Sequence, residues 1–113
     1  MSTEWDTKLA EIRRLNDEFR TSFIGGRVVV TLGIRALGNA RMARLLQAIR
    51  SFDRFDKGND PYHEHDFGSL EDLGTRIFWK IDYYNNKMDQ GSPDPADRSI
   101  TVRVLTIMLA EEY

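Results

Sequence analysis

The stretch TRIFWKIDYYN, residues 75–85, decides the fold class, because its apolar and polar side chains alternate along the chain. In an extended strand, successive side chains point to opposite faces of a sheet. One face carries Ile77, Trp79, Ile81 and Tyr83, and the other carries Arg76, Phe78, Lys80, Asp82 and Tyr84. We predict that the first face packs on the core. The second face is polar enough to meet solvent, and its two aromatic side chains leave room for a partner or a covering loop.

The segments upstream predict two more strands. His65–Leu70 comes directly before the first strand and is joined to it by Glu71–Gly74. Farther upstream, Arg27–Leu32 contains three consecutive valines, which disfavour a helix and suit a strand that is buried on both faces. Turn-forming residues in Lys57–Pro61 separate these segments. We therefore expect a small three-stranded sheet.

Three helices are expected to cover this sheet. The first is predicted over Glu4–Arg20, with Thr3 as its cap. Its apolar stripe consists of Trp5, Leu9, Ile12, Leu15 and Phe19. The second is predicted over Ala40–Phe55 after the cap Asn39, and the third over Pro95–Glu112 after the cap Asp94. The order α-β-α-β-β-α predicts an α+β fold, with one domain over residues 1–113.

The composition excludes several kinds of site. The chain has 113 residues, of which 41% are apolar and 30% are charged, as in ordinary globular proteins. It has no cysteine, which excludes disulfides, thiolate metal sites and cysteine nucleophiles and is typical of the reducing cytosol. No apolar run approaches the ~20 residues of a membrane helix, and no glycine-rich phosphate-binding motif occurs. We therefore expect a cytoplasmic protein without a membrane span or a cofactor.

Several blocks of the sequence are long enough to compare with known families. They are Asn59–Tyr62, Glu64–Gly68, Lys80–Tyr84, Ser92–Asp97 and Thr101–Tyr113, together with Leu15–Asp17, Phe19–Arg20 and Val28–Gly33. Over roughly residues 12–113 the chain resembles the bacterial domain-of-unknown-function family numbered 3768, which occurs mostly in alphaproteobacteria and often on mobile elements. The resemblance implies a whole domain of that family and no assigned activity. This chain has His63 where the family pattern has glycine.

The segment DPYHEHD, residues 60–66, holds the most reactive side chains. In an extended chain His63 and His65 point the same way, so they could bind a divalent metal with a carboxylate from elsewhere. That carboxylate could come from Asp60, Asp94, Asp97 or Glu111. Alternatively, Glu64, His65 and Asp66 could form the acid–base centre of a hydrolase-like enzyme, completed by Asp94 or Asp97. His-x-His alone is a weak signal, so we favour a structural loop with no bound metal.

The first half of the chain is basic and the second half acidic. Residues 1–57 carry 11 Lys and Arg against 7 Asp and Glu, whereas residues 58–113 carry 5 against 11. The arginines of the first half are Arg13, Arg14, Arg20, Arg27, Arg35, Arg41, Arg44, Arg50 and Arg54. Arginine suits phosphate contacts, so the first two helices could bind nucleic acid. However, these arginines are scattered and no helix-turn-helix signature accompanies them, so we expect solvated helix faces.

These observations favour a protein-binding module, accessory or inhibitory, over an enzyme or a nucleic-acid binder. We expect one polar and aromatic surface where three segments converge: the 60–66 loop, the 80–84 strand and the 94–97 helix start. Its candidate residues are Asp60, Tyr62, Glu64, His65, Asp66, Lys80, Asp82, Tyr84, Asp94 and Asp97. Tyrosine provides contact area and a hydrogen bond at a low entropic cost, so the expected partner is another protein.

Overall fold

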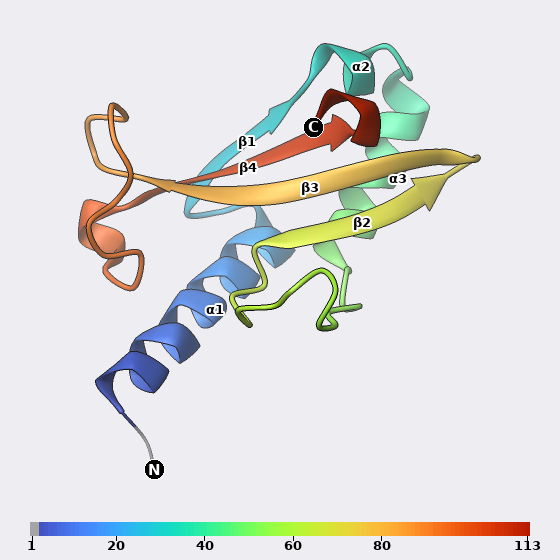
Figure 1. Ribbon diagram of the computed structural model, residues 1–113. Helices are drawn as coiled ribbons and strands as arrows, with labels where there is room; N and C mark the ends of the chain where they lie inside the picture. The colour runs from blue at the N-terminus through green and yellow to red at the C-terminus, as the bar shows by residue number, and fades with distance from the viewer. Residues whose placement is uncertain (1–2) are drawn as a thin grey trace.

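The computed structural model describes residues 3–113, which form three α-helices and a four-stranded mixed sheet (Figure 1). The helices are α1 (Glu4–Ser22), α2 (Leu32–Arg35) and α3 (Asn39–Arg50). The strands are β1 (Gly26–Val30), β2 (Phe67–Asp72), β3 (Thr75–Tyr84) and β4 (Val102–Leu109). Two 3-10 turns, η1 (Arg98–Ile100) and η2 (Ala110–Glu112), flank the last strand. The fold class is therefore α+β, as the sequence predicted.

The strands lie in the order β1-β4-β3-β2, in which β1 runs parallel to β4 and the other neighbours are antiparallel. The alternation along β3 is confirmed, because Ile77, Trp79 and Ile81 are at most 3% exposed. In the register of the sheet, Trp79 lies opposite Gly68 on one side and Ile107 on the other. The core therefore forms between this face of the sheet and the helices.

The helix predicted over Pro95–Glu112 is wrong, because most of this segment is the strand β4. The sheet consequently has four strands rather than three, and β4 lies at its centre between β1 and β3. A central strand is buried on both faces, so its apolar residues do not alternate with polar ones. Val104, Leu105, Ile107 and Met108 are all buried. Periodicity alone cannot distinguish this continuous apolar run from a buried helix. The β-branched residues of the segment, however, favour a strand.

The valine-rich segment is a strand, but it is shorter than predicted and lies at the edge of the sheet. Arg27 and Val29 are exposed, so the expected burial on both faces is wrong. The strand stops at Val30 because the Thr31 side chain accepts a hydrogen bond from the Ile34 backbone N–H and caps α2, a helix that the sequence did not indicate.

The first helix matches its prediction most closely. The Thr3 hydroxyl accepts a hydrogen bond from the Asp6 backbone N–H, and the Asp6 carboxylate accepts one from Thr3, which completes a capping box. Ile12, Leu15 and Phe19 are buried as expected, whereas Trp5 is 67% exposed and lies outside the core. Along residues 3–113, no helix is long and apolar enough to cross a membrane.

Three predicted boundaries are also wrong. The second predicted helix, α3, ends at Arg50 rather than Phe55, because Phe52 and Phe55 turn into the core beside Trp79. Asn39 is the first helical residue, and Gly38 precedes it without a side-chain cap. The strand predicted from His65 begins at Phe67, because the backbone of His65 has φ 56°, which no extended strand allows.

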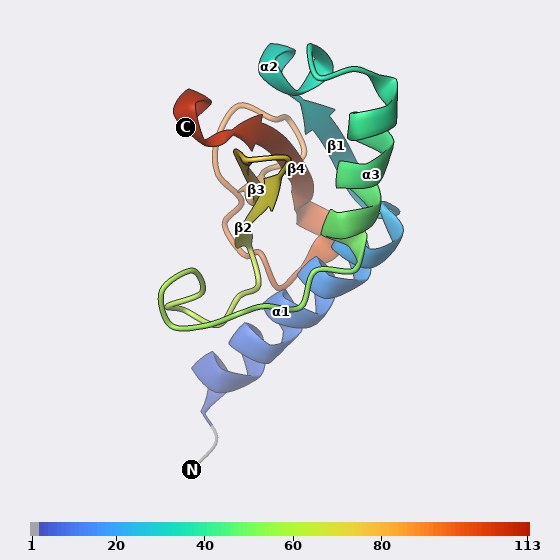
Figure 2. The same cartoon turned by 90° about the vertical axis from the view of Figure 1, so that its right-hand side faces the viewer.

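α1 and α3 pack on one face of the sheet, as the view in Figure 2 shows. We call the opposite side of β2, β3 and β4 the uncovered face. The register places these side chains on it: Phe67 and Ser69 of β2, Phe78, Lys80, Asp82 and Tyr84 of β3, and Val104, Thr106 and Met108 of β4. Neither α1 nor α3 lies on this face. Val104 and Met108 are nonetheless buried on this face, whereas the β3 side chains are half-buried and meet neither α1 nor α3.

Gly68 should be essential for packing of the core, because any side chain there would enter the space of Trp79 and Phe52. A Cβ atom on Gly68 would lie 2.6 Å from Trp79 Cε2 and 2.8 Å from Phe52 Cζ. We expect Gly68→Ala to lower the free energy of unfolding by about 1–3 kcal/mol, measured by urea denaturation. Gly91→Ala is the matched control, since its Cβ would meet only Tyr83 O at 3.8 Å. Equal stability of the two variants would contradict this packing.

Candidate functional site

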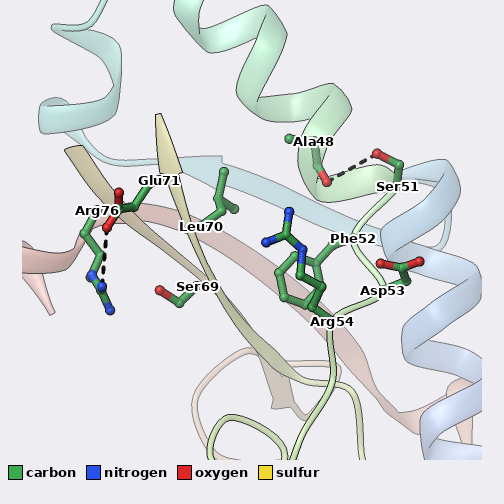
Figure 3. A pocket seen from close by; sticks show the side chains of 9 residues that line it. All are labelled: Ala48, Ser51, Phe52, Asp53, Arg54, Ser69, Leu70, Glu71 and Arg76. Carbon is green, nitrogen blue, oxygen red and sulfur yellow. Dashed lines mark hydrogen bonds and ion pairs between the residues drawn. The ribbon is translucent and has the colours of Figure 1, made fainter. Parts of the chain in front are cut away.

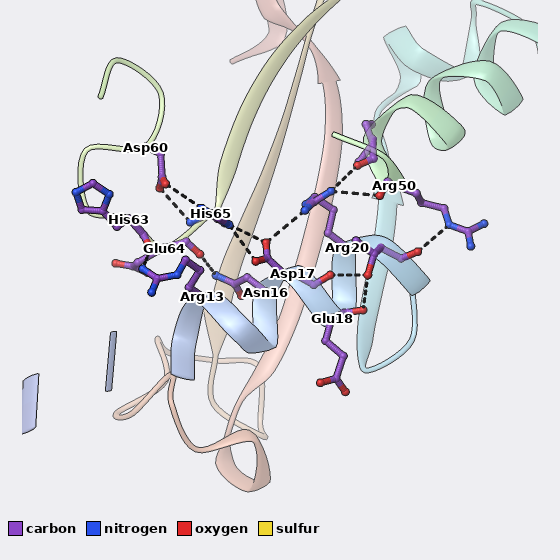
Figure 4. A network of polar contacts seen from close by, with 12 residues as sticks. Arg13, Asn16, Asp17, Glu18, Arg20, Arg50, Asp60, His63, Glu64 and His65 are labelled. Atoms are coloured by element: carbon purple, nitrogen blue, oxygen red, sulfur yellow. Dashed lines mark hydrogen bonds and ion pairs between the residues drawn. The ribbon is translucent and has the colours of Figure 1, made fainter. Parts of the chain in front are cut away.

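Asn16 of α1 is the centre of a polar network that joins distant parts of the chain (Figure 4). Its side-chain amide donates hydrogen bonds to the Tyr83 hydroxyl (2.8 Å) and to the Glu64 backbone carbonyl (3.0 Å). Its carbonyl oxygen accepts a hydrogen bond from Arg103 Nε (2.7 Å). Asn16 is fully buried, so these bonds replace those that it would make with water.

The network extends from Asn16 to the loop that precedes β2 and to the segment that precedes η1. The Tyr83 hydroxyl donates to Glu64 Oε1 (2.5 Å), and Arg103 Nη2 donates to the Pro95 carbonyl (2.6 Å). Burial, together with the bond to Glu64, raises the pKa of Tyr83 above its ordinary value. Burial lowers the pKa of Arg103 from its ordinary value. The Arg103 guanidinium lies over the Tyr83 ring, 5.2 Å from the ring centroid. The phenol therefore stays protonated and acts as a hydrogen-bond donor.

His65 forms a second cluster beside this network. Its Nδ1 lies 2.8 Å from Asp17 Oδ1, and its Nε2 lies 3.5 Å from Asp60 Oδ2. The Asp60 carboxylate also accepts a hydrogen bond from the His65 backbone N–H (3.0 Å). The imidazole stacks on the Phe55 ring, with centroids 3.8 Å apart. Both ring nitrogens thus face carboxylates, and the ring is fixed between α1 and the loop of residues 53–66.

Arg20 links this cluster to α3. Its Nη1 donates to the backbone carbonyls of Ile49 (2.9 Å) and Arg50 (3.3 Å), and its Nη2 donates to Asp17 (3.3 Å). A cation at the C-terminal end of a helix is stabilised by the helix dipole. The guanidinium carbon also lies 5.5 Å from the Trp79 ring centroid, so Nη1 and Nη2 have acceptors and the cation has an aromatic neighbour, whereas the buried Nε has no hydrogen-bond partner.

The candidate residues of the 60–66 loop divide into inward and outward groups. Asp60, Glu64 and His65 point into the clusters described above and hold the loop on α1. Tyr62 is exposed and takes no part in the hydrogen bonds of these clusters. Asp66 is half-buried, and burial together with repulsion from the Glu64 carboxylate raises its pKa to about 6. The first group therefore serves the fold, whereas Tyr62 is available for contacts.

The candidate residues of the other two segments lie apart from these clusters. Lys80, Asp82 and Tyr84 are on the uncovered face, where Lys80 Nζ pairs with Asp82 at 2.7 Å and this bond raises the pKa of the lysine. Asp94 and Asp97 do not start a long helix. Asp94 accepts a hydrogen bond from the Ala96 backbone N–H, and Asp97 caps the turn η1. The three segments do converge, through Tyr83 and the Pro95 carbonyl, and of the predicted side chains Glu64 takes part by accepting the hydrogen bond of the Tyr83 hydroxyl.

The histidine pair does not have the geometry that an extended segment would give it. His63 and His65 both have positive φ, at 59° and 56°, so the loop is turned at each residue. Figure 4 shows their rings apart, with only His65 facing Asp17 and Asp60. Across residues 3–113, no three His, Asp or Glu side chains are grouped so that they could hold a metal ion. The expectation that the two histidines point the same way is wrong.

The arginines of the basic half mostly make contacts within the protein. Arg20 is buried, Arg41 and Arg44 bind the Asp72 carboxylate, and Arg14 pairs with Glu11 and Glu18. Arg13 donates to the His63 carbonyl and Arg50 donates to the Thr21 carbonyl. These side chains bind groups of α1, of α3, of the loop before β2 and of the β2–β3 hairpin. They therefore do not line one continuous surface for phosphate contacts.

The central members of both clusters were not among the candidate site residues predicted from the sequence: Asn16, Asp17, Arg20, Tyr83 and Arg103. A signal for two of them was present in the first helix. Asn16 and Arg20 are four residues apart and lie next to the apolar residues Leu15 and Phe19, so one turn of the buried side of the helix carries polar groups. Polar residues at such positions require buried partners.

A comparison with family models matches residues 30–112 to DUF3768, described as a protein of unknown function. The chain belongs to this family. No curated protein and no solved structure gives a significant match. The matched range includes the loop of His65, Tyr83 and Arg103, whereas α1, with Asn16 and Asp17, lies before it. Membership in DUF3768 brings no known activity.

The two histidines should respond differently to glycine, because only one has side-chain partners. Glycine adopts positive φ without strain, so His63→Gly should raise the free energy of unfolding by roughly 0.5 kcal/mol. His65→Gly relieves the same strain but removes the stacking on Phe55 and the bond to Asp17, so it should lower that free energy by about 1–2 kcal/mol. Chemical denaturation of both variants measures the difference. If the two histidines bound a metal together, both changes would instead lower the free energy of unfolding.

Asp66 should make the protein less stable as the pH rises. Its pKa is raised to about 6 in the folded state, from 3.8 in an unfolded chain, so the folded state holds this proton more tightly. The group therefore reduces stability progressively between about pH 4 and pH 6, and the full cost remains at neutral pH. Asp66→Asn should raise the free energy of unfolding at pH 7.5 by about 1 kcal/mol, after allowing for solvent screening, and by little at pH 3.5. A gain that is independent of pH would contradict the repulsion described here.

Proposed function

We propose that this chain is a protein-binding module that recognises its partner with the uncovered face of the sheet. The observation that carries this proposal is that aromatic and charged side chains share a sheet face on which neither α1 nor α3 packs. A sheet face without a covering layer is normally polar, whereas clustered aromatics on such a face are typical of interfaces.

The aromatic part of the surface consists of Phe67, Phe78 and Tyr113. The rings of Phe67 and Phe78 have centroids 5.1 Å apart, and the Tyr113 ring meets Phe78 edge-on at 5.6 Å. Phe67 and Phe78 are half-buried and Tyr113 is exposed, so the cluster presents ring area to solvent. Aromatic side chains of this kind provide the anchors that dominate binding energy in protein interfaces.

The polar part of the surface lies farther along β3. The pair Lys80–Asp82 is partly exposed and is followed by Tyr84 on the same face. Asp82 is half-buried, so its carboxylate still meets solvent. A partner with a basic side chain here would bind this carboxylate beside Lys80 and gain a charge-assisted hydrogen bond. The expected partner is therefore a protein with an apolar anchor beside a basic side chain.

The geometry around His65 gives less support to the enzyme alternative. The two ring nitrogens of His65 face Asp17 and Asp60, and among the described residues no serine, threonine or tyrosine hydroxyl bonds to this ring. A general base needs a free nitrogen within reach of the proton that it removes. The geometry of His65 is better explained by its role in fixing the loop.

Site-specific cross-linking tests this proposal. A photoreactive phenylalanine analogue is placed at Phe78 and, as the control, at the exposed Trp5 of α1, a helix that lies on the opposite face of the sheet. In lysate of a bacterium that encodes the chain, the probe at position 78 should label one protein reproducibly, and Asp82→Lys should reduce that labelling roughly tenfold. If both positions label the same proteins with equal yield, the uncovered face is not the binding surface.

A further inference from the structure

The edge of the sheet offers a second kind of surface, because β2 has a neighbour on one side only. The Asp66 carbonyl accepts a hydrogen bond from the Ile81 backbone N–H, so the residues of β2 in register with Asp66 face β3. In an antiparallel pair, the main-chain groups of the alternate residues point the other way. Phe67, Ser69 and Glu71 therefore direct their backbone N–H and C=O groups to the free edge. Such a row of groups is a template for another strand.

A groove of about 530 Å³ runs along this free edge (Figure 3). One wall is β2, with Ser69, Leu70 and Glu71. The other wall is the last turn of α3 and the segment that follows it, with Ser51, Phe52 and Arg54. The strand edge is thus not hidden by the helix, and the space beside it can hold an extended segment of chain.

The walls of the groove are held at fixed positions. At one end, Arg41 and Arg44 of α3 bind the Asp72 carboxylate, with Arg41 Nε 2.8 Å from Asp72 Oδ2. At the other end, the Arg20 guanidinium binds the last carbonyls of α3. Because its walls are already ordered, the groove loses little conformational entropy when it binds an extended segment.

The charged residues that line the groove indicate which kind of side chain a bound segment should carry. Figure 3 shows the Arg54 side chain lying between Phe52 and β2, and no carboxylate of residues 3–113 pairs with it. Arg76 already pairs with Glu71 at 3.4 Å. Asp53 also lines the groove, next to Arg54 on the segment that follows α3. A carboxylate on the bound segment would form an ion pair with the Arg54 guanidinium.

We infer that the groove between β2 and α3 binds an extended peptide segment of another protein, which pairs with β2 as a fifth strand and places an acidic side chain on Arg54. The main-chain bonds would provide affinity and the Arg54 contact would provide specificity. This site goes beyond the proposed function, because it uses the strand edge and not the uncovered face.

The test uses phage-displayed random octapeptides selected on the full chain. The selected peptides should contain an acidic residue among β-branched or aromatic ones, and a synthetic copy should shift the amide NMR signals of Ser69 and Glu71. Ser69→Pro removes one outward N–H without touching the bonds to β3 and should weaken binding roughly tenfold. Arg54→Glu should weaken it similarly, and an acidic-to-Lys change in the peptide should restore binding to that variant.

The controls separate this site from the uncovered face. Arg35→Glu changes an exposed arginine of α2 and should leave peptide affinity unchanged, as should Asp82→Lys. The inference is overturned if no peptide is enriched over the Ser69→Pro chain or if Arg54→Glu binds equally well. It is also overturned if the free chain sediments as a dimer with the Ser69 amide already protected, because a second copy would then occupy the edge.

Discussion

The buried guanidinium of Arg20 is the contact on which the arrangement of the helices depends. It joins α1 to the C-terminal end of α3, lies against the Trp79 ring of the core, and shares Asp17 with His65. A buried charge without partners would cost several kcal/mol, so this position requires all of its partners at once. The adjacent Asn16 network extends the same constraint to Tyr83 and Arg103. The two clusters together fix the 53–66 loop, which has no helix or strand of its own.

Local sequence patterns correctly predicted the helix and the strand that each bury one face only. The alternation along β3 and the stripe of α1 each reflect one buried face, so the sequence indicated both correctly. β4 is buried on both faces, and its apolar run therefore resembled a helix. The capping signals at Asp94 and Pro95 strengthened that error, although there they stabilise short turns. In this chain a correct prediction of β4 required knowing its neighbours, β1 and β3, which no local window contains.

The same distinction applies to the candidate site. Sequence reasoning found the reactive loop because Asp, Glu and His are concentrated in residues 60–66. It did not find Asp17, Asn16 and Arg103, because these partners lie 48 to 87 residues away from the groups that they bind. The sequence favoured a structural loop at these residues, and Asp60 is a buried acceptor of the His65 backbone N–H. The surfaces that we propose for partners are the uncovered face and the free edge of β2.

The position of β4 has a consequence for biosynthesis. The central strand comes after every other strand in the chain, and its parallel partner β1 pairs with it across 77 residues, as in Val28 with Leu105. While the ribosome is still making β4, the sheet can contain only the β2–β3 hairpin, and the valines of β1 have no strand to pair with. The sheet is therefore complete only when β4 emerges, and until then the unpaired strand segments are prone to aggregation.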